Sequence, residues 1–262
     1  MQTISTRIWQ EEAEPGNPFA AQVARCHGYD VYGEMLGNAR WSDMLFLLFA
    51  GQAPSTAQGR LLESLAVALA NPGPRDASVH AAMCGGTGGS TSASCLAAAL
   101  AVGAGLNGGS REVFLAMENW QVCACDPAKW ASRLTDKPVE TASIWPAAEH
   151  AAGFDPHAVT TSLPVRQTLA VLAACSPGER LPWLAQCHAE LEAMAGHPLA
   201  MSGVAAAAMA DLGLAPEQGE MLYLLLRLPG AAAHALEQKQ ISHRNFPFFA
   251  LELSEASSGE KS

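Results

Sequence analysis

The residue type and the position of Asn107 suit a role in binding or catalysis. This residue lies in a glycine-rich turn after an Ala-rich stretch over 97–101, which is typical of a buried helix, and before Ser110, a good N-cap for a helix from Arg111. Such a turn can hold one polar side chain at the edge of a packed core. An asparagine amide can donate a hydrogen bond to an oxyanion but cannot transfer a proton. The alternative interpretation is an ordinary corner between two helices.

A second polar stretch covers 153–164 and holds His157. The residues after it are spaced as in a helix, and this helix carries Arg166. The sequence therefore places an imidazole and a guanidinium close together along the chain, one in a loop and the other in the helix that follows.

Residues 76–95 contain a cluster of glycines around Thr87, as a phosphate-binding loop would. Such a loop follows a strand, opens a helix and ends in Gly-Lys-Ser or Gly-Lys-Thr. Here no strand pattern precedes the glycines, and that ending is missing. We therefore expect a flexible link between two buried helices.

Metal binding is not expected from the cysteines. Cys123 and Cys125 have the wrong spacing for a zinc knuckle, and no second pair lies nearby. The chain has 7 cysteines, an odd number, and all lie in or near apolar helical stretches. We expect buried thiols rather than a disulfide framework.

The elements that must position these residues are expected to be helices. Apolar residues recur at helical spacing, and Ser, Asp, Gly and Pro mark the helix ends. We expect an irregular stretch over 121–146, a kink or division at Pro229-Gly230, and no strand of any length. Besides the helix that carries Arg166, the expected helices include 44–49, a helix capped by Ser55 or Thr56 with its apolar face over 61–69, a helix from Arg111, 181–195, 203–212 and 217–238.

Length and composition bound the class of protein. A chain of 262 residues with 49% hydrophobic and 15% charged residues suits one large domain. The net charge of −10 argues against a nucleic-acid partner. No apolar run reaches the roughly 18 residues of a membrane span, and the charged N-terminus lacks a signal-peptide core. We expect a cytoplasmic protein with a leader over 1–26, a helical domain over 27–250 and a flexible tail over 251–262.

Five segments, in this order, resemble the citrate synthase superfamily, and most closely its short citryl-CoA lyase-like members. They are HGYDVYGEMLGNARWSDMLFLLFAG, GAGLNGGSREVF, GFDPHAVTTSLPVR, LAMSGVAAAAMADLG and RLPGAAAHALEQ. The resemblance implies an all-α, multi-helix fold that forms a homodimer through Ala-rich helices, with the site at or near the interface. It also implies acyl-CoA and di- or tricarboxylic acid ligands, and no cofactor besides the CoA thioester as substrate or ligand.

The family's reaction joins or cleaves a carbon–carbon bond between an acyl-CoA methyl group and a keto acid. A carboxylate removes the proton, one histidine stabilises the enolate oxygen, and a second histidine polarises the keto carbonyl. The resemblance places Asn107 at the first histidine and Ser202 at the catalytic aspartate, so both groups are altered. His157 matches the second histidine, and Arg166 matches an arginine that binds a substrate carboxylate. Loss of a general base costs about 10²- to 10⁴-fold in rate.

Three further residues are implied to bind substrate. Arg227 and His234 match a late helix of the family, and Arg244 is a candidate for another anion contact. Each has an ordinary structural alternative: a surface charge for Arg227 and a satisfied core or interface histidine for His234. Ser202 is equally well explained as an N-cap. His27, His80 and His197 fit no motif.

Three functional hypotheses follow. The first is an enzyme of the citrate synthase type, acting on an acyl-CoA and an oxo acid with altered catalytic groups. The second is a catalytically silent paralogue that binds CoA or a dicarboxylate, or that is the partner subunit of an active homologue. The third is different chemistry in the same pocket, such as hydration or isomerisation of a carboxylic acid.

Overall fold

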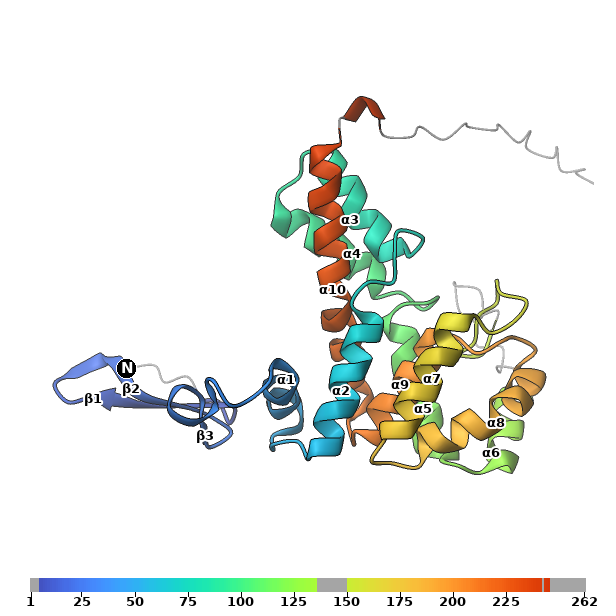
Figure 1. Ribbon diagram of the computed structural model, residues 1–262, viewed down its shortest axis with the longest axis horizontal. Helices are drawn as coiled ribbons and strands as arrows, with labels where there is room; N and C mark the ends of the chain where they lie inside the picture. The colour runs from blue at the N-terminus through green and yellow to red at the C-terminus, as the bar shows by residue number, and fades with distance from the viewer. Residues whose placement is uncertain (1–4, 136–149, 242, 246–262) are drawn as a thin grey trace, which may run out of the picture.

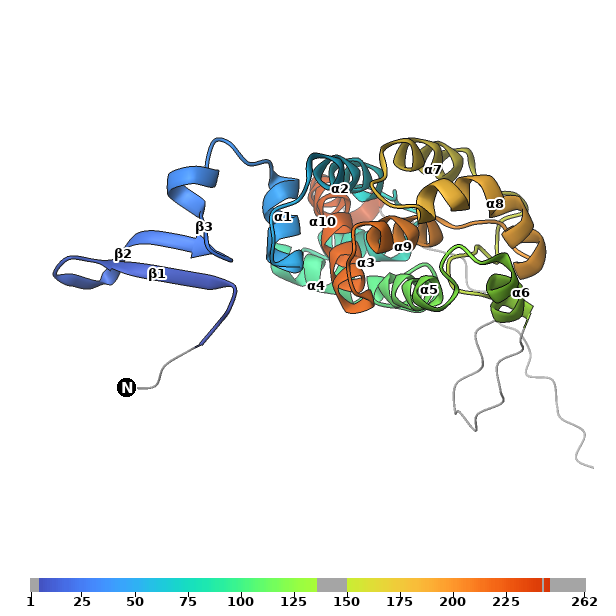
Figure 2. The ribbon, with the colours of Figure 1, turned by 90° about the horizontal axis from the view of Figure 1, so that it is seen from below.

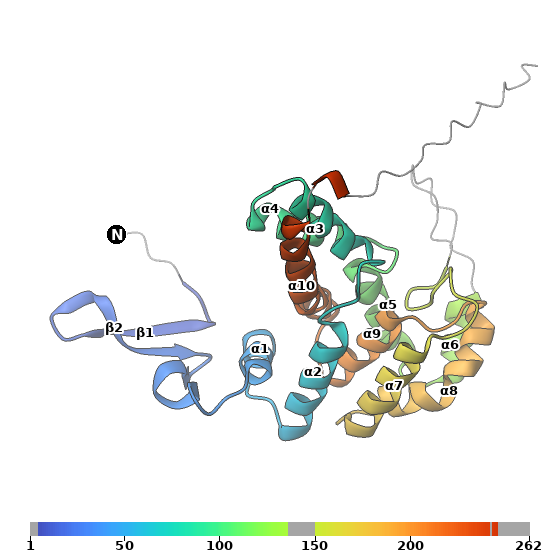
Figure 3. The same cartoon turned by 45° about the horizontal axis from the view of Figure 1, so that its top comes forward.

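The computed structural model describes residues 5–135, 150–241 and 243–245, which form a helical body with a small sheet beside it (Figure 1). The sheet has the order β1-β2-β3 and is antiparallel, with β1 at Trp9–Glu14, β2 at Asn17–Cys26 and β3 at Tyr29–Asp30. It lies apart from the helices in all three views (Figure 2, Figure 3).

The prediction that the chain contains no strand is wrong. Nearly all of β1 and most of β2 are exposed or half-buried on both faces. Alternation of apolar and polar residues marks a strand only where one face is buried. A hairpin exposed on both faces therefore leaves no such pattern in the sequence. A turn at Pro15 and Gly16 joins the two strands.

A five-residue π-helical turn at Val31–Met35 leads from the sheet to α1 at Trp41–Ala50 and α2 at Thr56–Leu69. Helix α1 begins earlier than predicted, because the Asp43 carboxylate accepts a hydrogen bond from the Arg40 backbone N–H at 3.0 Å. Ser55 caps α2 as predicted, with its hydroxyl accepting from the Gln58 N–H at 3.2 Å.

The flexible link predicted over 76–95 is instead mostly helical. Helix α3 covers Ala77–Thr87 and α4 covers Ser92–Gly103. Asp76 caps α3, accepting from the Ser78 N–H at 3.0 Å. A Cβ on Gly86 would lie 2.2 Å from the Ala235 carbonyl oxygen of the last long helix. This glycine therefore allows two helices to approach closely, whereas the sequence pattern was interpreted as flexibility.

The other helices form the larger part of the body around α9, whose residues from Ser202 to Met209 are all buried. The sequence predicts this pattern well, because these helices bury apolar faces against one another. They are α5 at Ser110–Cys123, α6 at Pro127–Thr135, α7 at Leu163–Cys175, α8 at Arg180–Ala195, α9 at Met201–Asp211 and α10 at Pro216–Gln240, followed by a 3-10 turn at His243–Asn245.

One other expectation fails in this region, and of the kink or division expected at Pro229-Gly230 the division is absent. Residues 127–135 form α6 within the stretch predicted to be irregular, because the buried Trp130 ring packs edge-on against Trp120, with 4.8 Å between centroids. Pro229 does not divide α10. The N–H of Gly230 donates to the Ala70 carbonyl at 2.7 Å, so α2 satisfies a group that the proline displaces from the helix ladder. The predicted tail over 251–262 lies outside the described residues.

The buried apolar side chains form two clusters. The larger one contains residues of α1, of α2 and of every helix from α5 through α10. The smaller one, at Val79, Ala82, Cys95, Ala99, Ala231 and Ala235, joins α3 and α4 to the C-terminal half of α10. Helix α10 therefore runs through both clusters (Figure 1). None of the described helices is long and apolar enough to cross a membrane.

All seven cysteines are free thiols, and the prediction of buried thiols holds for only some of them. Cys26, Cys95 and Cys123 are buried, whereas Cys84 is exposed. Burial raises the pKa of the Cys26 and Cys123 thiols above the usual value, which keeps them protonated at neutral pH.

Candidate functional site

A pocket of about 570 Å³ lies where the starts of α5 and α9 meet the middle of α10 and the loop over 150–164. This volume is within the usual range for small-molecule sites. Residues from five separate parts of the sequence line the pocket, and they include four of the predicted site residues: Asn107, His157, Ser202 and Arg227.

The Glu112 carboxylate holds three of these parts together, and its side chain is 2% exposed. One oxygen, Oε1, accepts hydrogen bonds from the Ser202 hydroxyl at 2.7 Å and from the Gly153 N–H at 2.9 Å. The other, Oε2, accepts from the Gly108 N–H at 2.5 Å and lies 3.9 Å from Nε2 of His150. Glu112 therefore links the turn next to Asn107, the loop that leads to His157 and the start of α9.

Local sequence explains why a carboxylate lies here. Gly109 is the N-cap of α5, so Glu112 is the third residue of the helix. An acidic side chain in the first turn can reach back to a free backbone N–H and is favoured by the positive end of the helix dipole. Sequence reasoning did not single out Glu112, although an acidic residue two positions after Ser110 was the available signal.

The loop that carries His157 is held against α9 by backbone contacts. The Ala200 N–H donates to the Gly153 carbonyl at 2.9 Å, and the Asp155 N–H donates to the Pro198 carbonyl at 2.8 Å. A Cβ on Gly203 would lie 2.4 Å from the Gly153 oxygen, so only glycine fits there. The Asp155 carboxylate accepts from the His157 N–H at 2.9 Å and shapes the turn. His157 is exposed, with its side chain on the pocket.

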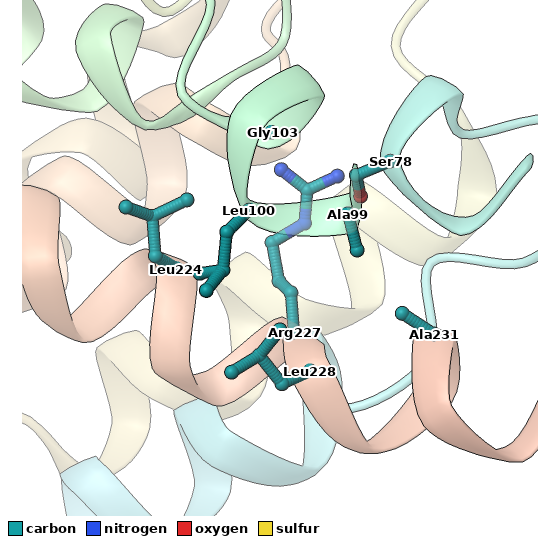
Figure 4. A pocket seen from close by; sticks show the side chains of 8 residues that line it. All are labelled: Ser78, Ala99, Leu100, Gly103, Leu224, Arg227, Leu228 and Ala231. Atoms are coloured by element: carbon teal, nitrogen blue, oxygen red, sulfur yellow. The ribbon is translucent and has the colours of Figure 1, made fainter. Parts of the chain in front are cut away.

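Arg227 forms the opposite side of the pocket. Its guanidinium makes an ion pair with Asp76 and donates to the Gly108 carbonyl at 3.2 Å, and its side chain is 7% exposed. Its carbon Cζ lies 4.7 Å from the centroid of the Tyr223 ring, close enough for a cation–π contact. Figure 4 shows Arg227 extending from α10 between Ser78 and Gly103.

The hollow drawn in Figure 4 is distinct from the larger pocket. It holds about 10 Å³ and is lined mainly by apolar side chains. This space admits one water molecule at most. The 570 Å³ pocket is therefore the candidate ligand site.

Tyr223 lines the pocket beneath Arg227 and is buried. The pKa of the Tyr223 phenol is raised to about 12, chiefly by burial; Arg227 acts to lower it, and the Asp76 and Glu112 carboxylates act to raise it. The phenol therefore stays protonated at neutral pH and can serve there only as a neutral hydrogen-bonding group.

No protein-family model and no curated protein sequence matches the chain. Among solved structures, a citryl-CoA lyase from Hydrogenobacter thermophilus superposes with a TM-score of 0.71 at 18% identity, over 97% of this chain and 98% of that one. The chain has the citryl-CoA lyase fold.

Two ATP citrate lyase structures are also similar to this chain. One, from Methanothrix soehngenii and in complex with citrate and coenzyme A, has a TM-score of 0.71 at 16% identity. The other, a Methanosaeta concilii variant in complex with (3S)-citryl-CoA, has a TM-score of 0.69 at 16% identity. The match covers 97% of this chain but 42% of each of those chains.

Within the citryl-CoA lyase fold, Arg166 does not join the other predicted residues. It lines a separate, more open hollow of about 530 Å³, together with His188 and His197. Arg166 lies on the outer face of α7, which directs the exposed guanidinium away from the pocket. Of the described arginines, the one that lines the 570 Å³ pocket is Arg227.

The two remaining predicted substrate-binding residues also lie elsewhere. His234 is two helical turns beyond Arg227 on α10, with Nδ1 3.4 Å from the Glu237 carboxylate. Arg244 belongs to the 3-10 turn after α10, at the far end of that helix from the pocket (Figure 1). Neither is among the described residues that line the pocket.

Ser202 is not an N-cap, because α9 is capped by Ala200 and Ser202 lies inside the first turn. It is 2% exposed and bonded to Glu112. Two further pocket residues, His150 and Asp76, were not singled out from the sequence. Their contacts within the pocket, His150 with Glu112 and Asp76 with Arg227, join residues far apart in the chain, which no local pattern reveals.

Metal ligation has no support in the described residues, where His, Cys, Asp and Glu side chains nowhere gather in threes suited to an ion. The pocket groups can instead donate hydrogen bonds, bind an anion and accept a proton. These are the capacities of Asn107 and His157, of Arg227, and of Glu112, respectively.

Proposed function

We propose that this protein joins or cleaves a carbon–carbon bond between an acyl-CoA and an oxo acid. The observation that carries the proposal is the convergence of Asn107, His157, Ser202 and Arg227 on one pocket. It is supported by the fold, which is that of a citryl-CoA lyase. It is further supported by the citrate, coenzyme A and citryl-CoA bound to the similar ATP citrate lyases.

Each polar side chain has a role in this reaction. The Asn107 amide donates a hydrogen bond to the thioester oxygen as it gains negative charge. The His157 imidazole polarises the carbonyl of the oxo acid. Arg227 binds a substrate carboxylate, the task that the sequence assigned to Arg166. The CoA thioester is itself a substrate, and the reaction needs no further cofactor.

The experiment combines synthesis and cleavage assays. Purified protein is mixed with acetyl-CoA or propionyl-CoA and a panel of oxo acids, and release of free CoA thiol is followed; citryl-CoA is tested separately for cleavage. His157→Ala should lower either activity by about 10²-fold or more. His188→Ala, in the neighbouring hollow, is the matched control and should leave the activity unchanged. If no substrate pair releases thiol and citryl-CoA is not cleaved, the proposal is wrong.

A silent, ligand-binding paralogue is the second candidate. It is favoured by the amide at Asn107 and the hydroxyl at Ser202, where the resemblance expects a histidine and a carboxylate, and by the pairing of Arg227 with Asp76. A thermal shift separates the two candidates. A ligand at 100 times its dissociation constant adds about 2.7 kcal/mol of apparent stability. Stabilisation by CoA, acetyl-CoA, oxaloacetate or citrate without turnover would support the silent paralogue.

We also propose that the protein forms a homodimer. In support, an apolar groove of about 840 Å³ lies between α1, α2 and α10. Its lining includes Trp41 and Val67, which are each 73% exposed. A surface of this kind is characteristic of interfaces. Light scattering after size exclusion should give twice the chain mass, and Val67→Glu should shift the protein towards the monomer.

A further inference from the structure

The proposed reaction requires a group that accepts a proton from the carbon next to the thioester. The described residues that line the pocket include three carboxylates. Asp76 is paired with Arg227 and caps α3. Asp155 shapes the His157 turn through two backbone N–H groups. Glu112 is the third, and its partners leave its charge without an arginine or lysine among the described ion pairs.

Glu112 reaches the pocket through Ser202. The Ser202 hydroxyl donates to Oε1 of Glu112 at 2.7 Å, which is the usual length for an O–H···O hydrogen bond. A hydroxyl has one proton to donate and two lone pairs that can accept. Since Glu112 uses the proton, the lone pairs of Ser202 are available to a substrate in the pocket that both residues line.

The environment of Glu112 keeps this geometry fixed. The N–H groups of Gly153 and Gly108 hold one carboxylate oxygen each. The imidazole of His150 faces Oε2 at 3.9 Å, with its side chain 5% exposed. Three segments therefore fix the carboxylate, and the hydroxyl bonded to Oε1 is that of Ser202.

We propose that Ser202 and Glu112 form a proton relay that replaces the missing general base; this rests on the proposed function. The α-C–H bond of the acyl-CoA breaks, and its proton goes to Oγ of Ser202. At the same time the original hydroxyl proton of Ser202 passes to Oε1 of Glu112. The electron pair stays on the substrate as an enolate, whose oxygen accepts a hydrogen bond from Asn107. Charge is conserved, because one carboxylate becomes neutral as one enolate forms.

The direct test is exchange of the acetyl-CoA methyl protons for deuterium in D₂O, followed by NMR with and without oxaloacetate. This measures proton removal separately from bond formation. Ser202→Ala and Glu112→Gln should each slow exchange by about 10²-fold or more. Acetyl-CoA binding, measured by thermal shift, should remain. Ser110→Ala is the matched control, because Ser110 is also a buried serine, on α5, and its hydroxyl lies outside the relay.

The decisive variant is Glu112→Gln combined with Ser202→Asp. It moves the carboxylate to the position of the hydroxyl and keeps the net charge unchanged. The relay predicts that this double variant recovers exchange to within about tenfold of the wild type, because its carboxylate contacts the substrate directly. A purely structural role of Glu112 predicts no recovery, since the second substitution restores none of the lost backbone contacts.

The outcomes separate the relay from the proposed function. If the wild type turns over and both single variants exchange at the wild-type rate, the relay is wrong and the function stands. Failure of the folded double variant to recover exchange also overturns the relay. Absence of exchange and of thiol release in the wild type overturns both. Ser202→Ala removes a single hydrogen bond, so it tests the relay even where Glu112→Gln does not fold.

Discussion

The pocket contains two buried charges that the fold stabilises in opposite ways. Glu112 is held by two backbone N–H groups and a hydroxyl, with His150 at 3.9 Å. Arg227 is held by a direct ion pair with Asp76 and by the face of Tyr223. Both side chains are under 10% exposed, at 2% and 7%.

The difference shows which charge is available to a ligand. Neutral donors position a carboxylate without cancelling its charge, so Glu112 can still accept a proton. An ion pair cancels charge, so Asp76 competes with any carboxylate that approaches Arg227. The candidate pocket therefore contains its own competitor for an anion at Arg227.

The largest expected effect is that of removing Glu112. Glu112→Ala leaves two buried donors and the part-buried Gly108 N–H without an acceptor, each buried one costing about 1–3 kcal/mol. We expect the free energy of unfolding to fall by about 4 kcal/mol in urea denaturation. Glu112→Gln keeps an acceptor and should cost about half as much. A loss below about 1 kcal/mol for the alanine variant would show that the hydrogen bonds of Glu112 do not stabilise the fold.

Breaking the ion pair from the arginine side comes next. Arg227→Met leaves the Asp76 carboxylate without its cation, and we expect a loss of about 3 kcal/mol in unfolding free energy. The double variant Asp76→Asn with Arg227→Met should be clearly more stable than Arg227→Met alone, because it removes the unpaired charge. Equal stabilities of these two variants, measured by urea denaturation, would contradict the pairing.

The pKa of Tyr223 is affected by both Glu112 and the Arg227–Asp76 pair, and it gives a test based on the pH dependence of stability. Since burial raises its folded pKa to about 12, above roughly 10 when unfolded, the unfolded chain loses this proton first. The stabilisation is therefore complete below pH 10 and is lost as the pH rises to about 12, by roughly 2–3 kcal/mol. Tyr223→Phe should flatten unfolding free energy against pH in this window. Tyr32→Phe, at a site 66% exposed, should leave the curve unchanged.

The smallest effect concerns ligand binding. Asp76→Asn removes the competing charge from Arg227 and keeps an oxygen that can cap α3. We expect roughly tenfold tighter binding of citrate, measured by calorimetry. Weaker binding would mean that the Asp76 carboxylate positions Arg227 for the ligand instead of competing with it.

The sequence predicts the part of the fold that is built from local patterns. Ser55 caps α2 and the apolar periodicity marks α8 and α9, because these signals act within a few residues. The sheet is missed, since β1 buries no residue and β2 buries only Ala24 and Cys26. Gly86 is misinterpreted, because the reason for it is the carbonyl of Ala235, about 150 residues away.

The candidate site also contains residues that local motifs identify and residues that only distant contacts reveal. Three residues chosen from the motifs, Asn107, His157 and Ser202, line one pocket. Arg166 lines a separate hollow, because its direction depends on how α7 packs. The motifs also leave out Glu112, whose importance comes from three long-range or turn contacts rather than from its neighbours in sequence.

The division of the apolar interior into two clusters has a dynamic consequence. The smaller cluster consists mainly of alanines and joins α3 and α4 to α10 beyond Pro229. It buries less apolar area, so this end of the molecule opens locally more often than the main core. Amide hydrogen exchange will be faster at Ala231 and Ala235 than at Leu222 and Leu226. An opening that carries α3 away also separates Asp76 from Arg227. Local opening of α3 and α4 therefore leaves the Arg227 charge unpaired in the pocket.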